Sequence, residues 1–286
     1  MAQPVRSQYG ALSMGAQPIW PETRAVEFLM RAARCLQSTP AERNRAIRFG
    51  IDLGTATIVL CAVDPGGEPV YWDFLPEGVV RDGVVVDFHG AVRAVGELKR
   101  RAEAALGLTV EAAATAHPPG VPVSDCQACR YVLEQAQVEC RLLIDEVSAA
   151  QTLLRVRDGV IVDVGGGSTG VGVFRNGELR TLSDRPGGGY HLDLILAGAL
   201  RIPVQEAEAR KRLHGGEFVS ILRPGVERIA DSIRRQCGSG GPFTVHLAGG
   251  ALLLPGADKI VAQYLDWPVV AYPHAHLITS FGIALN

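Results

Sequence analysis

The sequence has no apolar run that approaches the about 18 residues needed for a membrane-spanning helix. The first 17 residues carry glutamine, serine and glycine where a signal peptide would have its hydrophobic core. Both absences predict a cytoplasmic protein with no membrane span.

The chain also lacks an excess of positive charge. Its 286 residues include 28 Lys and Arg against 30 Asp and Glu, which gives a formal net charge of −2. A protein that binds nucleic acid through a broad surface needs clustered Lys and Arg to neutralise phosphates. The composition therefore predicts no nucleic-acid partner.

Cysteine is sparse and is not spaced as a metal site. Six cysteines are spread over more than 200 residues, and without an export signal we expect them to stay reduced and to serve packing. Cys126 and Cys129 could begin a zinc site, but no second C-x-x-C pair completes a tetrahedral set. A P-loop is absent as well, because the chain has no G-x-x-x-x-G-K-[ST] motif.

The N-terminus, residues 1–46, reads as a flexible segment that contains one amphipathic helix at 22–36. Within that helix the apolar residues recur at helical spacing, so one face must dock on something. We expect this face to pack on the protein's own surface. A role as a partner-binding helix is the alternative.

One supersecondary unit occurs twice in the chain. Residues 47–72 read as a β-hairpin interrupted by an acidic, glycine-containing turn, and residues 160–181 repeat the plan. Asp52 precedes the turn residue Gly66 by 14 residues, and Asp163 precedes Gly177 by 14. The two units are 111 residues apart and predict two lobes of related topology.

Strands alternate with helices between and after these units, which is typical of an α/β protein. The expected strands are 84–88, 110–116, 141–144 and 243–247, and the expected helices are 91–106, 124–137 and 148–154.

Both turns have the composition of a phosphate cradle. Asp52-Leu53-Gly54-Thr55 and the run from Asp163 to Thr169 offer backbone N–H groups without obstructing side chains, together with hydroxyls. Two carboxylates beside one polyphosphate would repel it unless a cation intervened. The pair therefore predicts MgATP, with Mg²⁺ held by Asp52 and Asp163 through water.

The run Gly165–Gly170 also matches the G-x-G-x-x-G dinucleotide fingerprint, which requires a helix immediately afterwards. Here the alternating residues 171–174 lead to Asn176-Gly177, which is typical of a hairpin. The pattern therefore favours a phosphate-binding hairpin over a Rossmann turn.

Five segments, in order, resemble the signature of the actin/Hsp70/sugar-kinase superfamily: 49–55, 143–150, 162–169, 247–251 and 277–285. Within that superfamily the chain is most similar to the EutJ family of ethanolamine-utilisation proteins, described as Hsp70-like chaperones. That likeness rests on the N-terminal extension and on 80–88, 117–120, 183–191 and 247–256.

The resemblance implies an α/β fold of two ribonuclease H-like lobes, each a mixed five-stranded sheet flanked by helices, with a nucleotide cleft between them. Lobe I would span 47–157 and lobe II 158–270, and the C-terminal helix within 271–286 would return to the hinge. Ala149, Ala150 and Gly282 would let two connecting helices cross closely.

The resemblance also assigns roles to residues. Glu146 takes the place of the acid that orients the attacking water, so the predicted catalytic residues are Glu146, Asp52 and Asp163; a helix-start acid is the alternative for Glu146. Glu208, Lys211 and Arg212 resemble the residues that hold ribose and adenine, although a solvated helix face has the same pattern. The full nucleotide-binding set is Gly54, Thr55, Ala56, Gly165, Gly166, Gly167, Ser168, Thr169, Gly188, Gly189, Glu208, Lys211, Arg212, Gly249, Gly250 and Ala251.

Family likeness further implies a nucleotide-dependent chaperone or reactivation factor for ethanolamine-degrading enzymes, bound to ATP or ADP. Its client would be ethanolamine ammonia-lyase or a component of a bacterial microcompartment. The chain has only three lysines, none near a phosphate loop in sequence, so we expect a slow ATPase. An actin-like filament protein and a small-molecule kinase remain alternatives.

Overall fold

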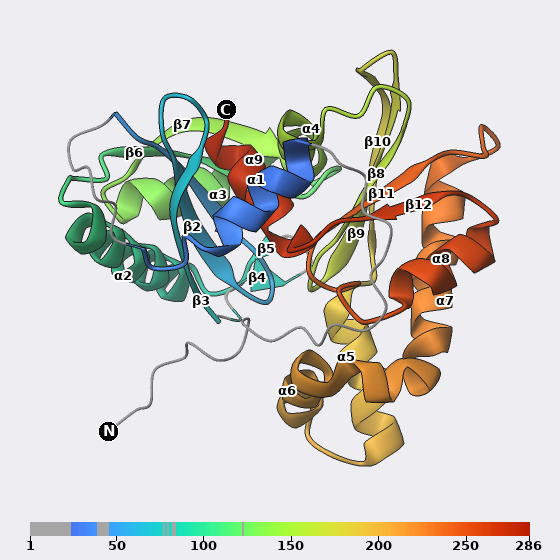
Figure 1. The fold of residues 1–286 in the computed structure, drawn as a ribbon. Helices are drawn as coiled ribbons and strands as arrows, with labels where there is room; N and C mark the ends of the chain where they lie inside the picture. The colour runs from blue at the N-terminus through green and yellow to red at the C-terminus, as the bar shows by residue number, and fades with distance from the viewer. Residues whose placement is uncertain (1–23, 39–45, 77, 79, 82–83, 122) are drawn as a thin grey trace.

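A computed structural model describes the chain outside residues 1–23, 39–45, 77, 79, 82–83 and 122. Two five-stranded mixed sheets lie on either side of two central helices, α4 and α9 (Figure 1). We call the sheet β3-β2-β1-β6-β7 with α2 and α3 lobe I, and the sheet β10-β9-β8-β11-β12 with α5 to α8 lobe II. The predicted pair of mixed five-stranded sheets is confirmed.

The two sheets share one topology. In each, three antiparallel strands are followed by two strands that add parallel to the first. The strands are β1 Arg48–Leu53, β2 Ile58–Val63, β3 Pro69–Leu75, β6 Ala112–His117, β7 Glu139–Asp145, β8 Gly159–Val164, β9 Ser168–Arg175, β10 Glu178–Pro186, β11 Val245–Ala248 and β12 Val269–Ala271, with a small ladder of β4 Val80–Arg81 and β5 Val84–Val85.

The helices cover the outer faces and the junction. They are α1 Arg24–Ala33, α2 Phe88–Leu106, α3 Val123–Gln135, α4 Glu146–Leu154, α5 Gly189–Leu200, α6 Val204–His214, α7 Val219–Cys237, α8 Ala257–Leu265 and α9 Ile278–Ala284, with short 3-10 helices η2 Gly215–Phe218 and η3 Ala275–Leu277. None of the described helices is long and apolar enough to cross a membrane.

Two helices begin earlier than the sequence predicts, and for the same reason. Asp87 caps α2 by accepting a hydrogen bond from the Gly90 N–H (2.8 Å), so the helix starts at Phe88 instead of residue 91. Asp145 caps α4 in the same way through the Ser148 N–H (2.8 Å), so this helix starts at Glu146 instead of residue 148. An acid cap extends each helix by two or three residues.

The amphipathic N-terminal helix docks on the body of the protein. Its described part, α1, buries Ala25, Phe28, Leu29 and Ala32. The Phe28 ring meets Phe281 of α9 edge-on at 5.4 Å, and the Trp72 indole N–H donates to the Ala32 carbonyl (2.9 Å). The expectation that this helix packs on the protein's own surface therefore holds for residues 24–33.

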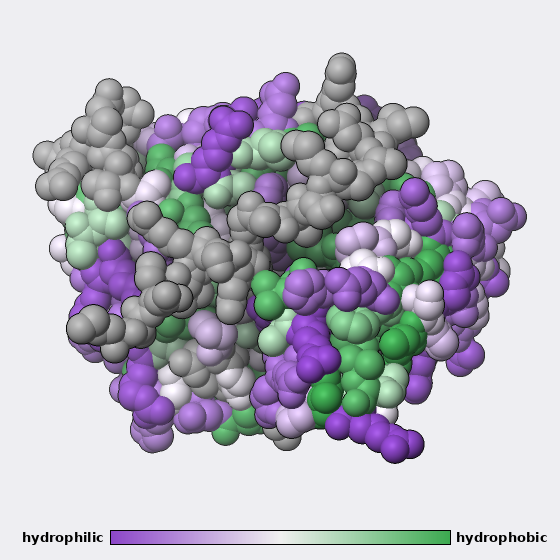
Figure 2. Space-filling model, turned by 60° about the horizontal axis from the view of Figure 1, so that its bottom comes forward, coloured by the Kyte–Doolittle hydropathy of each residue, from purple (hydrophilic) through white to green (hydrophobic). Residues whose placement is uncertain are grey.

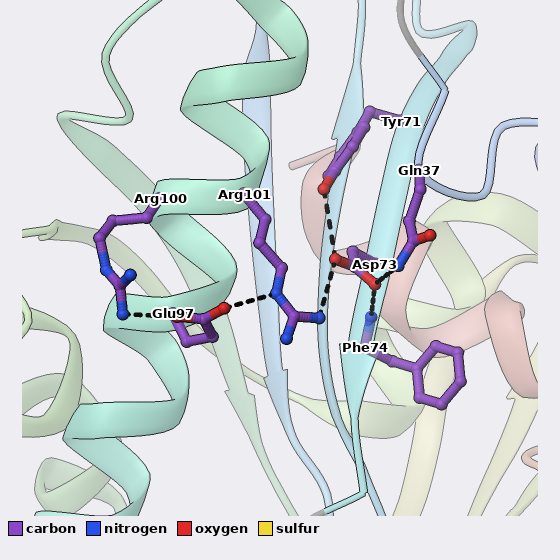
Figure 3. A network of polar contacts seen from close by, with 7 residues as sticks. All are labelled: Gln37, Tyr71, Asp73, Phe74, Glu97, Arg100 and Arg101. Atoms are coloured by element: carbon purple, nitrogen blue, oxygen red, sulfur yellow. Dashed lines mark hydrogen bonds and ion pairs between the residues drawn. The ribbon is translucent and has the colours of Figure 1, made fainter. Parts of the chain in front are cut away.

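A buried carboxylate fixes the segment that follows α1. Asp73 on β3 accepts a hydrogen bond from the Gln37 amide (2.9 Å) and one from the Phe74 backbone N–H (2.8 Å). Arg101 of α2 approaches the second oxygen at 3.5 Å and is itself held by Glu97 at 2.7 Å (Figure 3). This network ties the N-terminal extension to both β3 and α2.

We expect Phe28→Ala to destabilise the protein by about 3–5 kcal/mol, because it removes a fully packed ring from the junction of α1 and α9. Urea unfolding followed by circular dichroism measures the change. The matched control is Met30→Ala on the same helix, where 43% of the side chain is exposed and the change should stay below about 1 kcal/mol. Equal effects of the two variants would show that α1 does not pack as described.

One helix of lobe II has an unusual surface. α5 is mostly apolar apart from His191 and Asp193, and it exposes Tyr190 (51%) and Leu194 (43%). Figure 2 shows apolar side chains gathered over the helical part of lobe II, beside polar ones. Within the part of the chain that the structure describes, no element covers this face of α5.

His246 on β11 gives the fold a pH dependence. Burial lowers the pKa of His246 to about 4, and its Nδ1 lies 2.7 Å from the Tyr272 hydroxyl. In the unfolded chain the histidine has a pKa near 6.5 and takes up a proton first as the pH falls. The free energy of unfolding that neutral His246 contributes is therefore lost between about pH 6.5 and pH 4.

Between pH 7.5 and pH 4.5, His246→Gln should therefore lose about 2 kcal/mol less of its free energy of unfolding than the wild type does. The comparison is between variants because the buried carboxyls with raised pKa values, such as Asp163, act in the opposite direction. Thermal unfolding at half-unit steps from pH 7.5 to 4.5 tests this, and parallel curves for the two proteins would contradict it.

Candidate functional site

The two predicted acidic turns occupy equivalent places in the two sheets. Asp52 is the next-to-last residue of β1, and Asp163 is the next-to-last residue of β8. Each strand turns back into an antiparallel partner, β2 or β9. No helix follows the run Gly165–Gly167, so the structure rules out the Rossmann alternative.

The turns of the two lobes meet each other. A Cβ atom added at Gly166 would lie 3.2 Å from both the Cβ and the backbone nitrogen of Ala56 and 3.3 Å from the Cβ of Thr55. A side chain at Gly54 would collide with the Thr57 carbonyl at 2.7 Å. A side chain is thus excluded at Gly54, where the loop folds tightly, and Gly166 packs closely against the loop of the other lobe.

Two neighbouring hydroxyls of α9 hold the two carboxylates. The Thr279 hydroxyl donates to Asp163 Oδ2 (2.5 Å), and the Ser280 hydroxyl donates to Asp52 Oδ2 (2.8 Å). Consecutive residues of one short helix therefore anchor one acid from each lobe, and the two acids are near enough for the Asp52 charge to add to the raised pKa of Asp163.

Glu146 joins this acidic centre from the first position of α4. Burial raises the pKa of Glu146 well above its usual range, and the charges of Asp163 and Asp52 add to the effect. The pKa of Asp163 is raised to about 7, mainly by burial, although the Thr279 hydrogen bond opposes the shift. Burial also raises the pKa of Asp52. Such crowded carboxyls are stabilised either by protons or by a cation.

Two carboxylates facing one place do not make a closed metal cage. Among the described residues, no group of three or more His, Cys, Asp and Glu side chains is arranged to hold a metal ion. The buried cysteines that we expected to serve packing, Cys126 and Cys129, lie in α3, and burial raises the pKa of Cys129 to about 12.

The start of α5 is bonded to the loop of lobe II. The Gly189 N–H donates to the Gly165 carbonyl (2.9 Å), and the Tyr190 N–H donates to the Gly166 carbonyl (2.8 Å). A Cβ at Gly188 would lie 2.4 Å from the Gly165 oxygen. The backbone of Gly188 and Gly189 thus packs against the Gly165–Gly166 loop and supports it.

The predicted adenosine residues converge next to this segment. The Lys211 ammonium, on α6, bonds the Gly189 carbonyl (2.8 Å) and pairs with buried Asp193 (2.7 Å). A Cβ at Gly189 would contact Ala251 at 3.5 Å. Lys211 therefore has a structural partner in lobe II, which the sequence did not suggest.

The remaining predicted residues lie on the same side. Arg212 pairs with Glu208 one turn earlier in α6 (2.5 Å). A Cβ at Gly250 would lie 3.4 Å from His276. The pKa of His276 is lowered to about 3, first by burial and in part by the Arg212 charge. These contacts place Arg212, Gly250 and His276 in one neighbourhood, beside Gly249, whose Cβ would approach Asp163 Oδ1.

Sequence reasoning missed Asp193, His276, Thr279 and Ser280. The first two are lone polar residues whose partners are distant in the chain. Thr279 and Ser280 did leave a signal, because they are the two hydroxyl residues within the otherwise apolar α9.

The chain resembles several known proteins. Residues 160–280 match the family described as Cell division protein FtsA. The Ethanolamine utilization protein EutJ of Salmonella typhimurium (strain LT2) is 35% identical over 257 residues, which cover 90% of this chain and 91% of that protein.

Solved structures agree with these matches. The crystal structure of EutJ from Carboxydothermus hydrogenoformans aligns with a TM-score of 0.86 at 35% identity and covers 91% of this chain and 98% of that one. The structure of MreB 5 of Spiroplasma citri bound to AMPPNP aligns with a TM-score of 0.66 at 17% identity, over 85% of this chain and 95% of that one. The predicted two-lobed actin/Hsp70-like fold is thereby confirmed.

Proposed function

The chain belongs to the EutJ family of ethanolamine-utilisation proteins, and from this membership and the geometry of the cleft we propose that it is a nucleotide-dependent chaperone or reactivation factor. It binds ATP and ADP with Mg²⁺ between its lobes. Its client is ethanolamine ammonia-lyase or a microcompartment component, and it acts in the cytoplasm or at the microcompartment.

The observation that carries the proposal is the meeting of the two acidic hairpins. Asp52 and Asp163 come from different sheets and are held by adjacent hydroxyls of α9. Glycine-rich loops that expose backbone N–H groups suit phosphate oxygens. The fold neighbour MreB 5 was solved bound to AMPPNP, which supports a nucleotide as the ligand of this fold.

The donor set also fits Mg²⁺. Two carboxylates, with no third protein ligand in the described part of the chain, suit an ion that keeps most of its water and also binds phosphates. When bound, MgATP would supply a triphosphate whose terminal group can be transferred to water. Residues 54–56 of lobe I and 166–168 of lobe II would donate hydrogen bonds to it. Gly165 and Thr169 would support the second loop instead, because the Gly165 N–H donates to the Ser168 carbonyl (3.1 Å) and the Thr169 hydroxyl donates to the Gly187 carbonyl (2.6 Å).

Closure follows from differential affinity. Because the two loops belong to different lobes, a triphosphate that contacts both binds more tightly when the lobes are close. The diphosphate lacks one phosphoryl group and so loses part of this preference. That difference is what a switch needs to change its contact with a client.

Glu146 is proposed to orient the attacking water. Glu146→Gln should lower ATP turnover by about 10²-fold or more while leaving ATP affinity within about twofold, because a water-positioning carboxylate acts on the reaction and makes no ground-state contact. Phosphate release and isothermal titration measure the two quantities. The control is Glu227→Gln, which lies on α7 and pairs with Arg223. Unchanged turnover in Glu146→Gln would remove this role.

Isothermal titration with ATP and ADP, each with and without Mg²⁺, tests whether the protein is nucleotide-dependent. If neither nucleotide binds, the proposal is refuted.

An actin-like filament protein is the second candidate, and light scattering decides between them: growth of large particles on addition of MgATP would support the filament. Phosphate that appears on a metabolite instead of in solution would indicate a kinase.

A further inference from the structure

Thr279 and Ser280 stand out in α9. Every residue of this helix is buried, and Thr279 and Ser280 are its two polar members. Thr279 is 5% exposed and Ser280 is fully buried. The rest of α9 is apolar or glycine and packs between α4 and β1.

A buried hydroxyl is costly unless it is hydrogen-bonded, and a helix that only packs would be more stable with Ala or Val at both positions. Both hydroxyls are bonded, and each to a carboxylate that approaches from outside the helix. The Ser280 carbonyl also accepts from the Cys61 thiol of β2 (2.8 Å), which fixes α9 against lobe I.

The Thr279 and Ser280 hydroxyls bond carboxylates from different lobes. Asp163 belongs to lobe II and Asp52 to lobe I, while Thr279 and Ser280 are consecutive in the chain. Both carboxylates are therefore anchored on α9, and they lie near enough for the Asp52 charge to add to the raised pKa of Asp163. In each acid the hydroxyl occupies Oδ2 and leaves Oδ1 outside this contact.

We propose that Thr279 and Ser280 are positioning residues that set the spacing of the Asp52 and Asp163 carboxylates for a hydrated divalent cation. The inference rests on the proposed function, because the phosphates of the nucleotide would complete the ligands of that cation. The hydroxyls themselves touch neither cation nor nucleotide; they hold the acids at a fixed distance and orientation. Rotation of either lobe about α9 would change that spacing, so cation binding and lobe closure depend on the same two hydrogen bonds.

The test compares variants that remove or keep a hydroxyl. Thr279→Val is isosteric and lacks the donor, Thr279→Ser keeps it, and Ser280→Ala removes the other one. The matched control is Thr115→Val on β6, because Thr115 is fully buried and its hydroxyl has no hydrogen-bond partner among the residues that the structure describes. Isothermal titration with ATP over a series of Mg²⁺ concentrations gives the half-saturating Mg²⁺, and Mn²⁺ binding to the nucleotide-free protein by electron paramagnetic resonance gives a second readout.

We expect Thr279→Val to raise the half-saturating Mg²⁺ concentration about tenfold, which corresponds to ~1.4 kcal/mol. Affinity for ATP without Mg²⁺ should stay the same, Thr279→Ser should restore the wild-type value, and Thr115→Val should not change it. A role confined to packing would alter stability and leave the Mg²⁺ dependence unchanged.

An unchanged Mg²⁺ dependence in Thr279→Val, or an equal loss of ATP affinity with and without Mg²⁺, would overturn the inference while leaving the proposed function intact. If wild-type protein binds no nucleotide, the proposed function fails, and the Mn²⁺ titration alone then decides whether the hydroxyls position the carboxylates. If Thr279→Val does not fold, Ser280→Ala carries the same test, because alanine fits a packed helix at a small-residue position.

Discussion

Gly282→Ala is expected to destabilise the protein by more than about 4 kcal/mol, or to prevent folding. Gly282 lies in α9 where it crosses α4, and a Cβ at this position would be 2.0 Å from the Ala149 carbonyl oxygen and 2.6 Å from its carbon. Both obstacles are backbone atoms, so no side-chain rotation can relieve the contact. The two helices would have to move apart.

Separation of α4 and α9 would affect both lobes. Gly50 of β1 packs against the same helix, with a Cβ that would meet the Ala284 nitrogen at 2.6 Å. α9 is thus closely packed on two sides, and a shift away from α4 pushes it into β1. The small size of Ala149 and of Gly282 is what allows the short interaxial distance at this crossing.

Urea unfolding of Gly282→Ala and the wild type measures this effect. Gly96→Ala is the control, because Gly96 lies within α2 and nothing is within 4 Å of its added Cβ. There alanine should stabilise the helix by about 0.5–1 kcal/mol. A Gly282→Ala protein as stable as the wild type would mean that the helices do not cross as closely as described.

The sequence predicted the elements that carry a local signal. The two acidic turns, their hairpins and the sheets built around them follow from turn residues and β-formers that lie within 20 residues of one another. The predicted first residues of two helices were less accurate, because Asp87 and Asp145 cap these helices ahead of the apolar pattern. Periodicity reports the buried face of a helix and not its first turn.

Long-range partners could not be predicted in this way. The pairing of Lys211 with Asp193 and the bonds from Thr279 and Ser280 join residues brought together only by folding. The sequence indicated that Asp52 and Asp163 should face one ion. It did not indicate that one helix holds both, which depends on where the C-terminal segment returns.

Asp163→Asn is expected to abolish the dependence of ATP binding on Mg²⁺. Its amide oxygen can still accept the Thr279 hydrogen bond, so the substitution removes the charge and keeps the anchor. Affinity for MgATP should fall by about 10–100-fold, as for the loss of one charge-assisted interaction. Affinity for ATP without Mg²⁺ should be unchanged or higher, since one negative charge near the triphosphate is gone.

Titration of ATP with and without Mg²⁺ into Asp163→Asn and into Asp231→Asn tests this expectation. Asp231 lies on α7, far in the sequence from both phosphate loops, and it pairs with Arg235. Its variant should therefore behave as the wild type. If Asp163→Asn keeps the full Mg²⁺-dependent gain in affinity, the carboxylate does not serve the cation, and the proposed site is wrong.

Asp163→Asn should raise the thermal stability of the nucleotide-free protein even though it lowers the affinity for MgATP. Above pH 7 the Asp163 carboxylate is charged and buried next to Asp52 and Glu146, a cost that appears as its raised pKa. Asparagine removes that charge, so nucleotide-free Asp163→Asn should unfold at a higher temperature than the wild type at pH 8. A group that weakens the empty fold and strengthens the loaded one is typical of a binding site and not of a packing residue. Lower stability of the variant without nucleotide would instead assign Asp163 a structural role beside Thr279.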